Sequence, residues 1–450
     1  MKTDELFSLY KNLENDIANL SKLNKSTDKF GLKRINHFLN LLGNPHQCYK
    51  SIHVTGTSGK GSTATMIASI LGSEGFKTGL NISPSVQILN ERFQINNKII
   101  PTSKIRKTFD EMMPIIQDSG KHSEYGALTA FEIFASLAFM LFAKENIDVA
   151  IVEVGIGGMK DATNILDSQI SVITNIGLDH TEILGNSVEE IAKHKIGVIK
   201  QEQIVISGVR QLSLQKMIAG YGASMKATFR QLGKDFQWKL CENKEQLSIA
   251  FQDKSFKGIG LNMAGEFQFD NAACATAASV AFKKDLSEKS VQNGLKGSFL
   301  PGRMEVVHRN PLVILDGAHN VDKISASTDA IIKSYTFDRK IVIFSIKSDK
   351  LYREILQYIV EGTSILILTS FKTKEGHRKP LETDILALEV RQIEPSLEIH
   401  FIHEPQSAMR FALSRAREND LIWVTGSFHL VGEIRNLWYP SYELLSQAEQ

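Results

Sequence analysis

A glycine-rich loop near residue 56 is the feature that most constrains the fold of this chain. The β-branched run at residues 51–55 predicts a buried strand, and residues 62–71 have helical character. Between them lies the sequence Thr55-Gly56-Thr57-Ser58-Gly59-Lys60-Gly61-Ser62-Thr63. In a strand–loop–helix unit, successive backbone N–H groups can surround a polyphosphate. The loop therefore predicts an α/β domain that binds a nucleotide.

The side chains of this loop carry the chemistry that a nucleotide site needs. Lys60 supplies a positive charge, and the hydroxyl of Ser62 or Thr63 can reach a magnesium ion or a phosphate oxygen. The spacing differs from the common Walker motif, because Val54 stands where that motif has its first glycine. A glycine turn with a solvated lysine is the alternative, and the coincidence of strand, loop and helix argues against it.

Apolar runs downstream predict more strands of the same sheet. Residues 148–152 form a continuous apolar run that ends in the polar Glu153, as in a parallel strand buried on both faces. Residues 170–175 and 204–206 predict neighbouring strands. Because magnesium prefers oxygen ligands, Glu153 at the carboxyl end of its strand is the best metal ligand on physical grounds.

The remaining pattern predicts a second α/β unit. Polar helices are expected in the first fifty residues, a small antiparallel insertion at 229–260 and an alanine-rich helix at 265–278. A turn signal at 299–302 marks the expected boundary between a domain of residues 1–300 and a domain of residues 301–450. The strands expected in the second domain are 312–315, 340–344, 364–368 and 421–424. Residues 361–404 give only a weak signal.

Composition excludes several classes of partner. The 450 residues are 42% hydrophobic and 23% charged, which suits two or three packed domains rather than a disordered chain. Lys plus Arg is 52 and Asp plus Glu is 50, and a net charge of +2 provides no field to attract nucleic acid or an anionic membrane. We therefore expect small-molecule ligands, with no nucleic-acid partner.

The termini and the cysteines predict a cytoplasmic protein. The amino terminus is charged, and the most apolar run, residues 131–143, contains Glu132 and is too short to cross a bilayer. The cysteines Cys48, Cys241 and Cys274 are too few and too far apart for a disulfide framework or a thiolate metal site. We expect a soluble protein in a reducing compartment.

The sequence around the loop resembles the Mur-type ATP-dependent amide ligases, in the branch of folylpolyglutamate synthase and dihydrofolate synthase. The resemblance continues in order along nearly the whole chain. The matching strings after the loop are Ser83-Pro84, Asn90-Glu91-Arg92, residues 128–132, Glu153 to Gly158, Asp161 to Asn164, Leu178-Asp179-His180-Thr181, Lys195-Ile196-Gly197, Asn271-Ala272-Ala273, Pro301-Gly302-Arg303, Asp316 to Asn320 and Thr425-Gly426-Ser427. One such motif would be weak evidence, whereas an ordered set is strong.

The resemblance implies a fold and a reaction. The fold would be α/β, with a P-loop Mur-ligase-like domain, built on a doubly wound mostly parallel sheet, and a smaller Rossmann-like C-terminal domain. The reaction would be ATP-dependent addition of L-glutamate to dihydropteroate, or to the γ-carboxylate of a folate glutamate tail, through an acyl phosphate. The substrates would be ATP, L-glutamate and a pteroate or folate, and the protein would be a monomer.

The resemblance also implies a metal site. Glutamate, serine and histidine at positions 153, 83 and 180 bind magnesium in this family, and all three residue types are present as Glu153, Ser83 and His180. Lys195 matches a lysine whose carbamate holds a second magnesium, with a surface lysine as the alternative. A lysine accepts carbon dioxide only when it is neutral. The expected cofactors are therefore ATP, two magnesium ions, a carbamylated Lys195 and a potassium ion.

Other positions would bind nucleotide or act in catalysis. Thr57 to Ser62 would hold the phosphates, and Asn271, Arg303 and Asp316 would hold the adenine or ribose end of ATP. His319 follows a predicted strand and would face the cleft between the domains, so that Lys60, Lys195 and His319 form the expected catalytic set. The alternatives are a helix cap for Asn271, a surface ion pair for Arg303 and a turn at Asp316-Gly317.

The pterin side would be bound by three segments carried over position by position. These are Phe30-Gly31-Leu32, Thr129 to Glu132, and Lys160-Asp161-Ala162. Phe131 can stack on a flat heterocycle, and it is equally an ordinary core aromatic.

Some positions depart from the family pattern. Ser58, Ser85, Met159-Lys160, His194 and Phe267 stand where asparagine, histidine, Arg-Leu, glutamate and histidine are usual. These departures leave open a Mur-type amino-acid ligase with a different carboxylate substrate.

A P-loop kinase or NTPase would not need Arg303, Asp316 and His319 in a second unit. A non-catalytic relative would not need Lys60, Glu153, His180 and Lys195 together.

Overall fold

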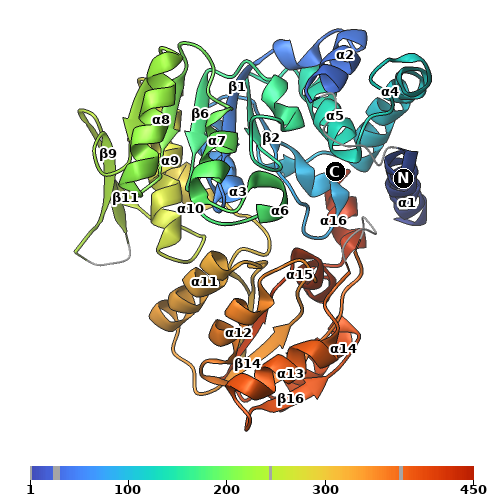
Figure 1. The fold of residues 1–450 in the computed structure, drawn as a ribbon, viewed down its shortest axis with the longest axis vertical. Helices are drawn as coiled ribbons and strands as arrows, with labels where there is room; N and C mark the ends of the chain where they lie inside the picture. Colours follow the sequence, from blue (N-terminus) through green and yellow to red (C-terminus); the bar gives the residue numbers. More distant parts are fainter. Residues whose placement is uncertain (1–2, 24–30, 243–245, 374–378) are drawn as a thin grey trace.

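The protein folds into a larger and a smaller α/β part, one above the other in Figure 1. The structure is a computed structural model that describes residues 3–23, 31–242, 246–373 and 379–450. Phe30 of the expected pterin site lies outside the described residues. In this part of the chain, no helix combines the length and the apolar composition needed to cross a membrane.

A mostly parallel sheet forms the centre of the larger part. Its strands are β1 (Lys50–Thr55), β2 (Thr78–Asn81), β3 (Phe93–Ile95), β4 (Lys98–Ile99), β5 (Val149–Glu153), β6 (Ile170–Ile173), β7 (Ile204–Ser207) and β8 (Thr228–Gln231). In the described chain the order is β4-β3-β2-β5-β1-β6-β7-β8. Neighbouring strands in the series β2, β5, β1, β6, β7 and β8 pair in parallel. At one edge, β3 pairs antiparallel with β2, and β4 pairs antiparallel with β3. The carboxyl ends of β1, β5 and β6 therefore meet at one edge.

Helices cover both faces of this sheet. The helices of the larger part are α1 (Thr3–Leu23), α2 (Lys33–Leu41), α3 (Lys60–Ser73), α4 (Thr102–His122), α5 (Ala130–Lys144), α6 (Thr181–Leu184), α7 (Val188–Ile196), α8 (Leu212–Ser224), α9 (Phe267–Phe282) and α10 (Glu288–Gly297). Strand β5 shows the arrangement, because Val149 and Ile151 pack with α3, α9 and α10, while Ala150 and Val152 pack with α1, α4 and α5. The apolar run of this strand is thus buried from both sides.

The antiparallel insertion is shorter than the sequence predicts. Strands β9 (Phe236–Leu240), β10 (Leu247–Phe251) and β11 (Lys254–Ile259) form a separate antiparallel sheet. The first residues of the predicted insertion, within Thr228–Gln231, instead form β8, which pairs parallel to β7 at the edge of the main sheet. Edge strands are only half buried, so alternation alone does not distinguish the two sheets.

The smaller part repeats the α/β architecture. Its strands are β12 (Glu305–Arg309), β13 (Leu312–Leu315), β14 (Lys340–Phe344), β15 (Thr363–Leu368), β16 (Glu398–Phe401) and β17 (Leu421–Thr425), and its helices are α11 (Val321–Ser334), α12 (Tyr352–Val360), α13 (Thr383–Ile393), α14 (Pro405–Arg415) and α15 (Phe428–Arg435). The order is β12-β13-β17-β14-β15-β16, with β12 antiparallel and the others parallel. The predicted α/β class is confirmed for both parts.

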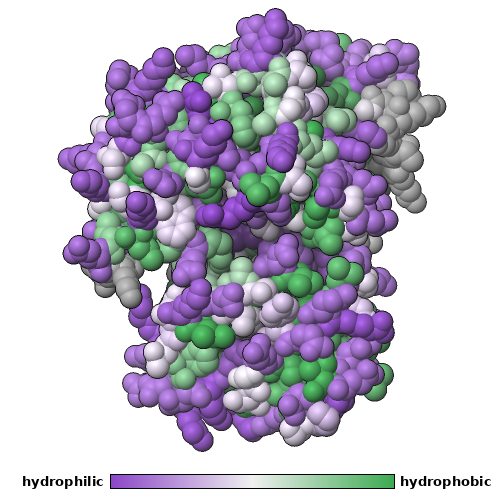
Figure 2. Space-filling model, turned by 60° about the vertical axis from the view of Figure 1, so that its left-hand side comes forward, coloured by the Kyte–Doolittle hydropathy of each residue, from purple (hydrophilic) through white to green (hydrophobic). Residues whose placement is uncertain are grey.

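The last helix returns to the larger part. Helix α16 (Ser441–Ala448) packs beside α1, and its Leu445 is fully buried in the core that contains α1, α4 and α5. Figure 2 shows hydrophilic residues gathered where the two parts meet.

Candidate active site

The glycine-rich loop connects β1 to α3 as predicted. Gly59 precedes the helix with a φ of 78°, a conformation that favours glycine, and a Cβ there would collide with the side chain of Asn271. Ser58 N–H donates to Asn175 Oδ1 at 2.8 Å, and Thr57 Oγ1 donates to the Gly177 carbonyl at 3.0 Å. Lys60 Nζ donates to the Gly56 carbonyl at 3.2 Å. The loop is thus held from the segment after β6.

A cavity of about 340 Å³, the loop cavity, lies between this loop and the smaller part. It is lined by predicted nucleotide residues from both parts, namely Ser58, Gly59, Ser62, Asn271, Arg303 and Asp316. Thr57, Lys60 and Gly61 belong to the same loop but do not line the cavity. Phe267, which departs from the family pattern, lies on its wall together with Lys323. Residues more than 200 positions apart therefore meet around one space.

Arg303 and Asp316 bring charged groups to the far wall of the loop cavity, where Asp316 is buried and Arg303 is half-buried. The Arg303 guanidinium lies 4.3 Å from the centre of the Phe428 ring, and burial lowers its pKa. Asp316 accepts a 2.5 Å hydrogen bond from Ser327 Oγ, while burial raises the pKa of this carboxyl. Neither residue is the surface ion pair or plain turn that was the alternative.

The predicted metal ligands lie beside the loop. Glu153 Oε2 accepts the Ser83 N–H at 2.9 Å and would be 3.3 Å from a Cβ at position 61, so that glycine lets the carboxylate approach the loop. Burial raises the pKa of Glu153, and the charge of Lys60 opposes this shift. Among the described residues, the buried His180 Nδ1 has no hydrogen-bond partner. An unpaired ring nitrogen and a carboxylate facing the loop fit a magnesium ion that keeps water and phosphate ligands.

This metal site has few protein ligands. In the part of the chain that the structure describes, no group of three His, Cys, Asp or Glu residues is placed to hold a metal by itself. Phosphate oxygens, water and the Ser83 hydroxyl would have to complete the coordination, which is the usual arrangement for magnesium.

Lys195 is buried beneath the glycine-rich loop. Its Nζ donates to the Gly56 carbonyl at 2.7 Å, and only 3% of the residue is exposed. Burial, together with the nearby charge of Lys60, holds the pKa of Lys195 well below its ordinary value. The surface-lysine alternative is therefore wrong for this residue.

A second cavity of about 530 Å³, the Phe131 cavity, lies within the larger part. It is lined by all the described residues of the predicted pterin site, which are Gly31, Leu32, Thr129, Phe131, Glu132, Lys160, Asp161 and Ala162. Arg34 Nε donates to both Glu132 oxygens at 3.0 and 2.8 Å, and both side chains are buried. His194 also lies on the wall. The cavity therefore combines an aromatic ring with paired charges.

A third cavity of about 220 Å³, the His319 cavity, lies between the two parts. His319 Nδ1 lies 2.7 Å from the Gly317 carbonyl, which can only accept, so Nδ1 carries the proton. Burial holds the pKa of His319 well below its ordinary value, and the ring is neutral. Other residues on its wall are Ser85, Arg92, His180, Lys347, Lys350 and Ser427. Arg92 also lines the Phe131 cavity, so these two cavities adjoin.

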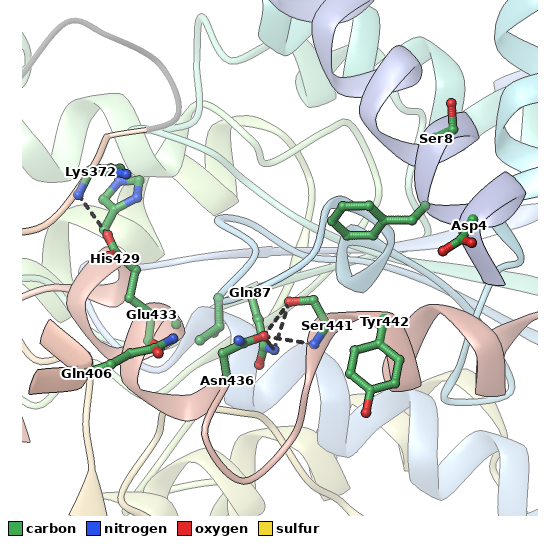
Figure 3. Close-up of a pocket in the computed structure, with 13 residues that line it drawn as sticks. Asp4, Ser8, Gln87, Lys372, Gln406, His429, Glu433, Asn436, Ser441 and Tyr442 are labelled. Atoms are coloured by element: carbon green, nitrogen blue, oxygen red, sulfur yellow. Dashed lines mark hydrogen bonds between the residues drawn. The ribbon is translucent and has the colours of Figure 1, made fainter. Parts of the chain in front are cut away.

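A further cavity of about 870 Å³ lies elsewhere, between α1, α15 and α16. Figure 3 shows Gln87, Asn436 and Ser441 joined by hydrogen bonds on its floor. None of the predicted site residues lines it.

Several residues of the site were not singled out from the sequence. Arg34, Lys323 and Lys350 fall outside the motifs, and Asp179 was noted only as part of a string. Lys323 lies in the first turn of α11, four residues after His319, and Lys350 lies shortly after the apolar strand β14. These positions are the only signals that sequence offers, because the contacts of these residues are long-range.

The fold and the three cavities define a class, the nucleotide-dependent ligases in which a P-loop domain and a second α/β domain enclose the reacting groups. Residues 54–279 match the model of the Mur ligase middle domain, and residues 302–428 match that of the Mur ligase glutamate ligase domain. A dihydrofolate synthase/folylpolyglutamate synthase of Bacillus subtilis is 31% identical over 416 residues, covering 90% of this chain and 94% of the relative. The chain belongs to the folylpolyglutamate and dihydrofolate synthase family of Mur ligases.

Solved structures agree with this family. Mycobacterium tuberculosis folylpolyglutamate synthase complexed with ADP has a TM-score of 0.89 and 26% identity, over 97% of this chain and 99% of that one. A bifunctional folylpolyglutamate synthase/dihydrofolate synthase with Mn, AMPPNP and L-glutamate bound has a TM-score of 0.81 and 25% identity. The match covers 93% of this chain and 96% of that one. The predicted Mur-ligase fold is confirmed.

Proposed function

We propose that this protein is an ATP- and magnesium-dependent ligase that adds L-glutamate to dihydropteroate, to the γ-carboxylate of folate glutamates, or to both. The observation that supports this most directly is the presence of three cavities, one at the glycine-rich loop, one within the larger part and one between the two parts. The reaction brings together a nucleotide, a carboxylate acceptor and an amino acid, and the three cavities would provide a separate space for each. Among solved structures with these names, one is complexed with ADP and another has Mn, AMPPNP and L-glutamate bound.

Each cavity suits one reactant. The loop cavity would take ATP, with Asn271, Arg303 and Asp316 at the nucleoside end. The Phe131 cavity would take the pterin, because an aromatic ring can stack on it and the Arg34–Glu132 pair presents polar groups to its edge. The His319 cavity would take L-glutamate, since Lys347 and Lys350 offer positive charge to its carboxylates.

The chemistry then proceeds in two steps. The acceptor carboxylate attacks the γ-phosphorus of ATP, forming an acyl phosphate and releasing ADP. The amine of L-glutamate attacks the acyl carbon, forming the amide and releasing phosphate. Lys60 would compensate charge on the transferred phosphoryl group. His319, neutral and with its Nε2 facing Lys323 at 3.3 Å, places a proton acceptor beside the incoming amine.

Two magnesium ions fit the residues present. Ser83, Glu153 and His180 would hold one, and a carbamylated Lys195 would hold the other, as the family resemblance implies. Magnesium supplies charge neutralisation for the phosphoryl oxygens. The orphaned His180 Nδ1 and the buried Lys195 amine support these assignments. The potassium ion, the monomeric state and the cytoplasmic location stay predictions from the sequence.

We also propose that the domain boundary lies at the turn before residue 302. Leu300 packs in a core of the larger part, and Met304 packs in a core of the smaller part. The domains would then be residues 1–300 and 301–450, with α16 returning to the first.

A changed carboxylate substrate is the second candidate function. It is favoured by the position of two departures from the family pattern, Lys160 and His194, on the wall of the Phe131 cavity. Ser85 lies in the His319 cavity, whereas Met159 lines none of the three.

The test is an assay of the purified protein with ATP, magnesium and L-glutamate. Dihydropteroate and tetrahydrofolate are offered separately, and phosphate release is measured together with the mass of the product. We expect a glutamyl unit on at least one acceptor and a loss of about a hundredfold or more in Lys60→Met. Lys216→Met, an exposed lysine on α8, is the matched control and should keep full activity. ATP binding without glutamyl transfer to either acceptor would favour the changed substrate.

A further inference from the structure

Asp179 joins the two parts of the molecule at the centre of the site. It follows β6 in the larger part, and its carboxylate accepts hydrogen bonds from the smaller part. Asn320 Nδ2 donates to it at 3.0 Å, Lys323 Nζ at 3.3 Å and Lys350 Nζ at 3.1 Å, and within the larger part the backbone N–H of His180 donates at 3.0 Å. Only 8% of the Asp179 side chain is exposed. A buried carboxylate bound by cations of another domain is a strong and directional contact.

The two lysines serve different cavities. Lys323 lies on the wall of the loop cavity, and Lys350 lies on the wall of the His319 cavity. Lys323 also contacts His319, whose Nε2 is 3.3 Å from the Lys323 amine. One carboxylate of the larger part thus fixes a cation at each of two sites that different reactants would fill.

Burial makes this pairing necessary. The side chains of Lys323 and Lys350 are only 14% and 12% exposed. Buried ammonium groups are costly unless a carboxylate or a ligand oxygen compensates their charge. The Asp179 carboxylate provides this compensation for both lysines and keeps them in place.

We propose that Asp179 is a positioning residue of the ligase reaction, which holds Lys323 toward the phosphates of ATP and Lys350 toward a carboxylate of L-glutamate. This inference rests on the proposed function, because it assigns ATP to the loop cavity and L-glutamate to the His319 cavity. Asp179 touches neither reactant. The acceptor carboxylate approaches from the Phe131 cavity, which Lys323 and Lys350 do not line.

A second ion pair between the two parts provides a matched control. Lys333 Nζ of α11 lies 2.8 Å from Glu266 Oε2, just before α9. Both side chains are more than half exposed, at 57% and 60%, and neither lines one of the three cavities. An exposed pair of this kind contributes little to docking of the domains. Glu266→Gln therefore removes an inter-domain contact without disturbing the cations of the site.

The test compares Michaelis constants in the full-length protein. In Asp179→Asn we expect the KM for ATP and the KM for L-glutamate each to rise at least about fivefold. The KM for the folate acceptor should stay within about a factor of two, and Asp179→Glu should recover part of the loss. Lys323→Met should raise the KM for ATP alone, and Lys350→Met the KM for L-glutamate alone. Glu266→Gln should change none of them.

Three results would overturn the inference. They are a lower kcat in Asp179→Asn with unchanged KM values, an increased KM for the folate acceptor, and equal effects in Glu266→Gln. A binding measurement separates this inference from the proposed function. We expect the affinity for a non-hydrolysable ATP analogue, measured by calorimetry, to fall in Asp179→Asn, and an unchanged affinity contradicts the role. Absence of glutamyl product from the wild-type protein would refute the proposed function alone.

Discussion

Burial changes the chemistry of the Lys195 side chain. An exposed lysine is protonated at neutral pH and does not react with carbon dioxide. Because burial and the charge of Lys60 lower its pKa, a larger fraction of Lys195 is neutral at a given pH. A neutral amine can form a nitrogen–carbon bond to carbon dioxide and release a proton, which leaves a carbamate. The neutral fraction increases as the pH rises.

We expect protein incubated with isotopically labelled bicarbonate to give a carbamate NMR signal that Lys195→Arg lacks. Arginine stays protonated and forms no carbamate. Lys195→Arg should also lose about a hundredfold in ligase rate. Lys193→Arg, an exposed position on the same helix α7, is the control and should keep both the signal and the rate. A carbamate signal that persists in Lys195→Arg would assign the modification to another residue.

At the residue scale, sequence predicts those groups whose role follows from the local chain. The positions of Lys60 and Glu153 in the site could be predicted from the local sequence. Glu153 ends a predicted strand, and Lys60 begins the helix that follows another. The position of Arg34 could not be predicted, because its partner Glu132 is 98 positions away. The role of Asp179 could not be predicted either, since its lysine partners belong to the other part of the molecule. Ser83 and His180 were reached only through the family resemblance.

At the scale of elements, the start of α3 depends on one glycine. A residue with a side chain at position 59 would be strained at a φ of 78° and would also displace Asn271. Asn271 Oδ1 accepts from Thr63 Oγ1 at 3.3 Å, which ties α9 to α3 beside the loop cavity. A change at Gly59 therefore disturbs the loop and the wall of the cavity together.

We expect Gly59→Ala to weaken binding of an ATP analogue by about tenfold or more, which calorimetry measures. The matched control is Gly75→Ala, since Gly75 has a φ of 100° but open space around a Cβ. Both variants should lose about 1–2 kcal/mol of unfolding free energy from backbone strain. Only Gly59→Ala should lose affinity for the ATP analogue. An equal loss of affinity in Gly75→Ala would mean that backbone strain alone explains the effect.

Buried strands that carry a run of apolar or β-branched residues were predictable, whereas the buried β2, with the sequence Thr-Gly-Leu-Asn, and the edge strands were not. Strands β5, β14 and β17 contain continuous apolar runs, β1 is a β-branched run, and the structure buries all four almost completely. Strand β16 is a half-exposed edge strand in a segment with a weak signal, so no apolar pattern marks it. Assignment of β8 to the antiparallel insertion failed for the same reason.

At the scale of the whole molecule, the chain passes between the two parts near residue 301 and again near residue 440. At the second passage, Gln87 Nε2 donates to the Tyr439 carbonyl at 2.6 Å and to Ser441 Oγ at 3.0 Å. Helix α16 then buries Leu445 in the core of the larger part. The smaller part is thus attached to the larger one at two places, on either side of the site.

Removal of residues 441–450 should therefore separate the unfolding of the two parts. The cores of the smaller part contain no residue of α16, so this part should still fold after the deletion. We expect a single calorimetric transition in the full chain and two transitions in the shortened one, because cooperative unfolding needs the parts to stabilise each other.

Tyr442→Ala, an exposed position of α16, is the control for the deletion and should keep one transition. Leu445→Ala should lower the free energy of unfolding by about 2–5 kcal/mol through the cavity that it leaves. If the shortened chain unfolded in one transition at the original temperature, α16 would not couple the parts. The contacts at the site, with Asp179 at their centre, would then be sufficient to make the molecule unfold as one unit.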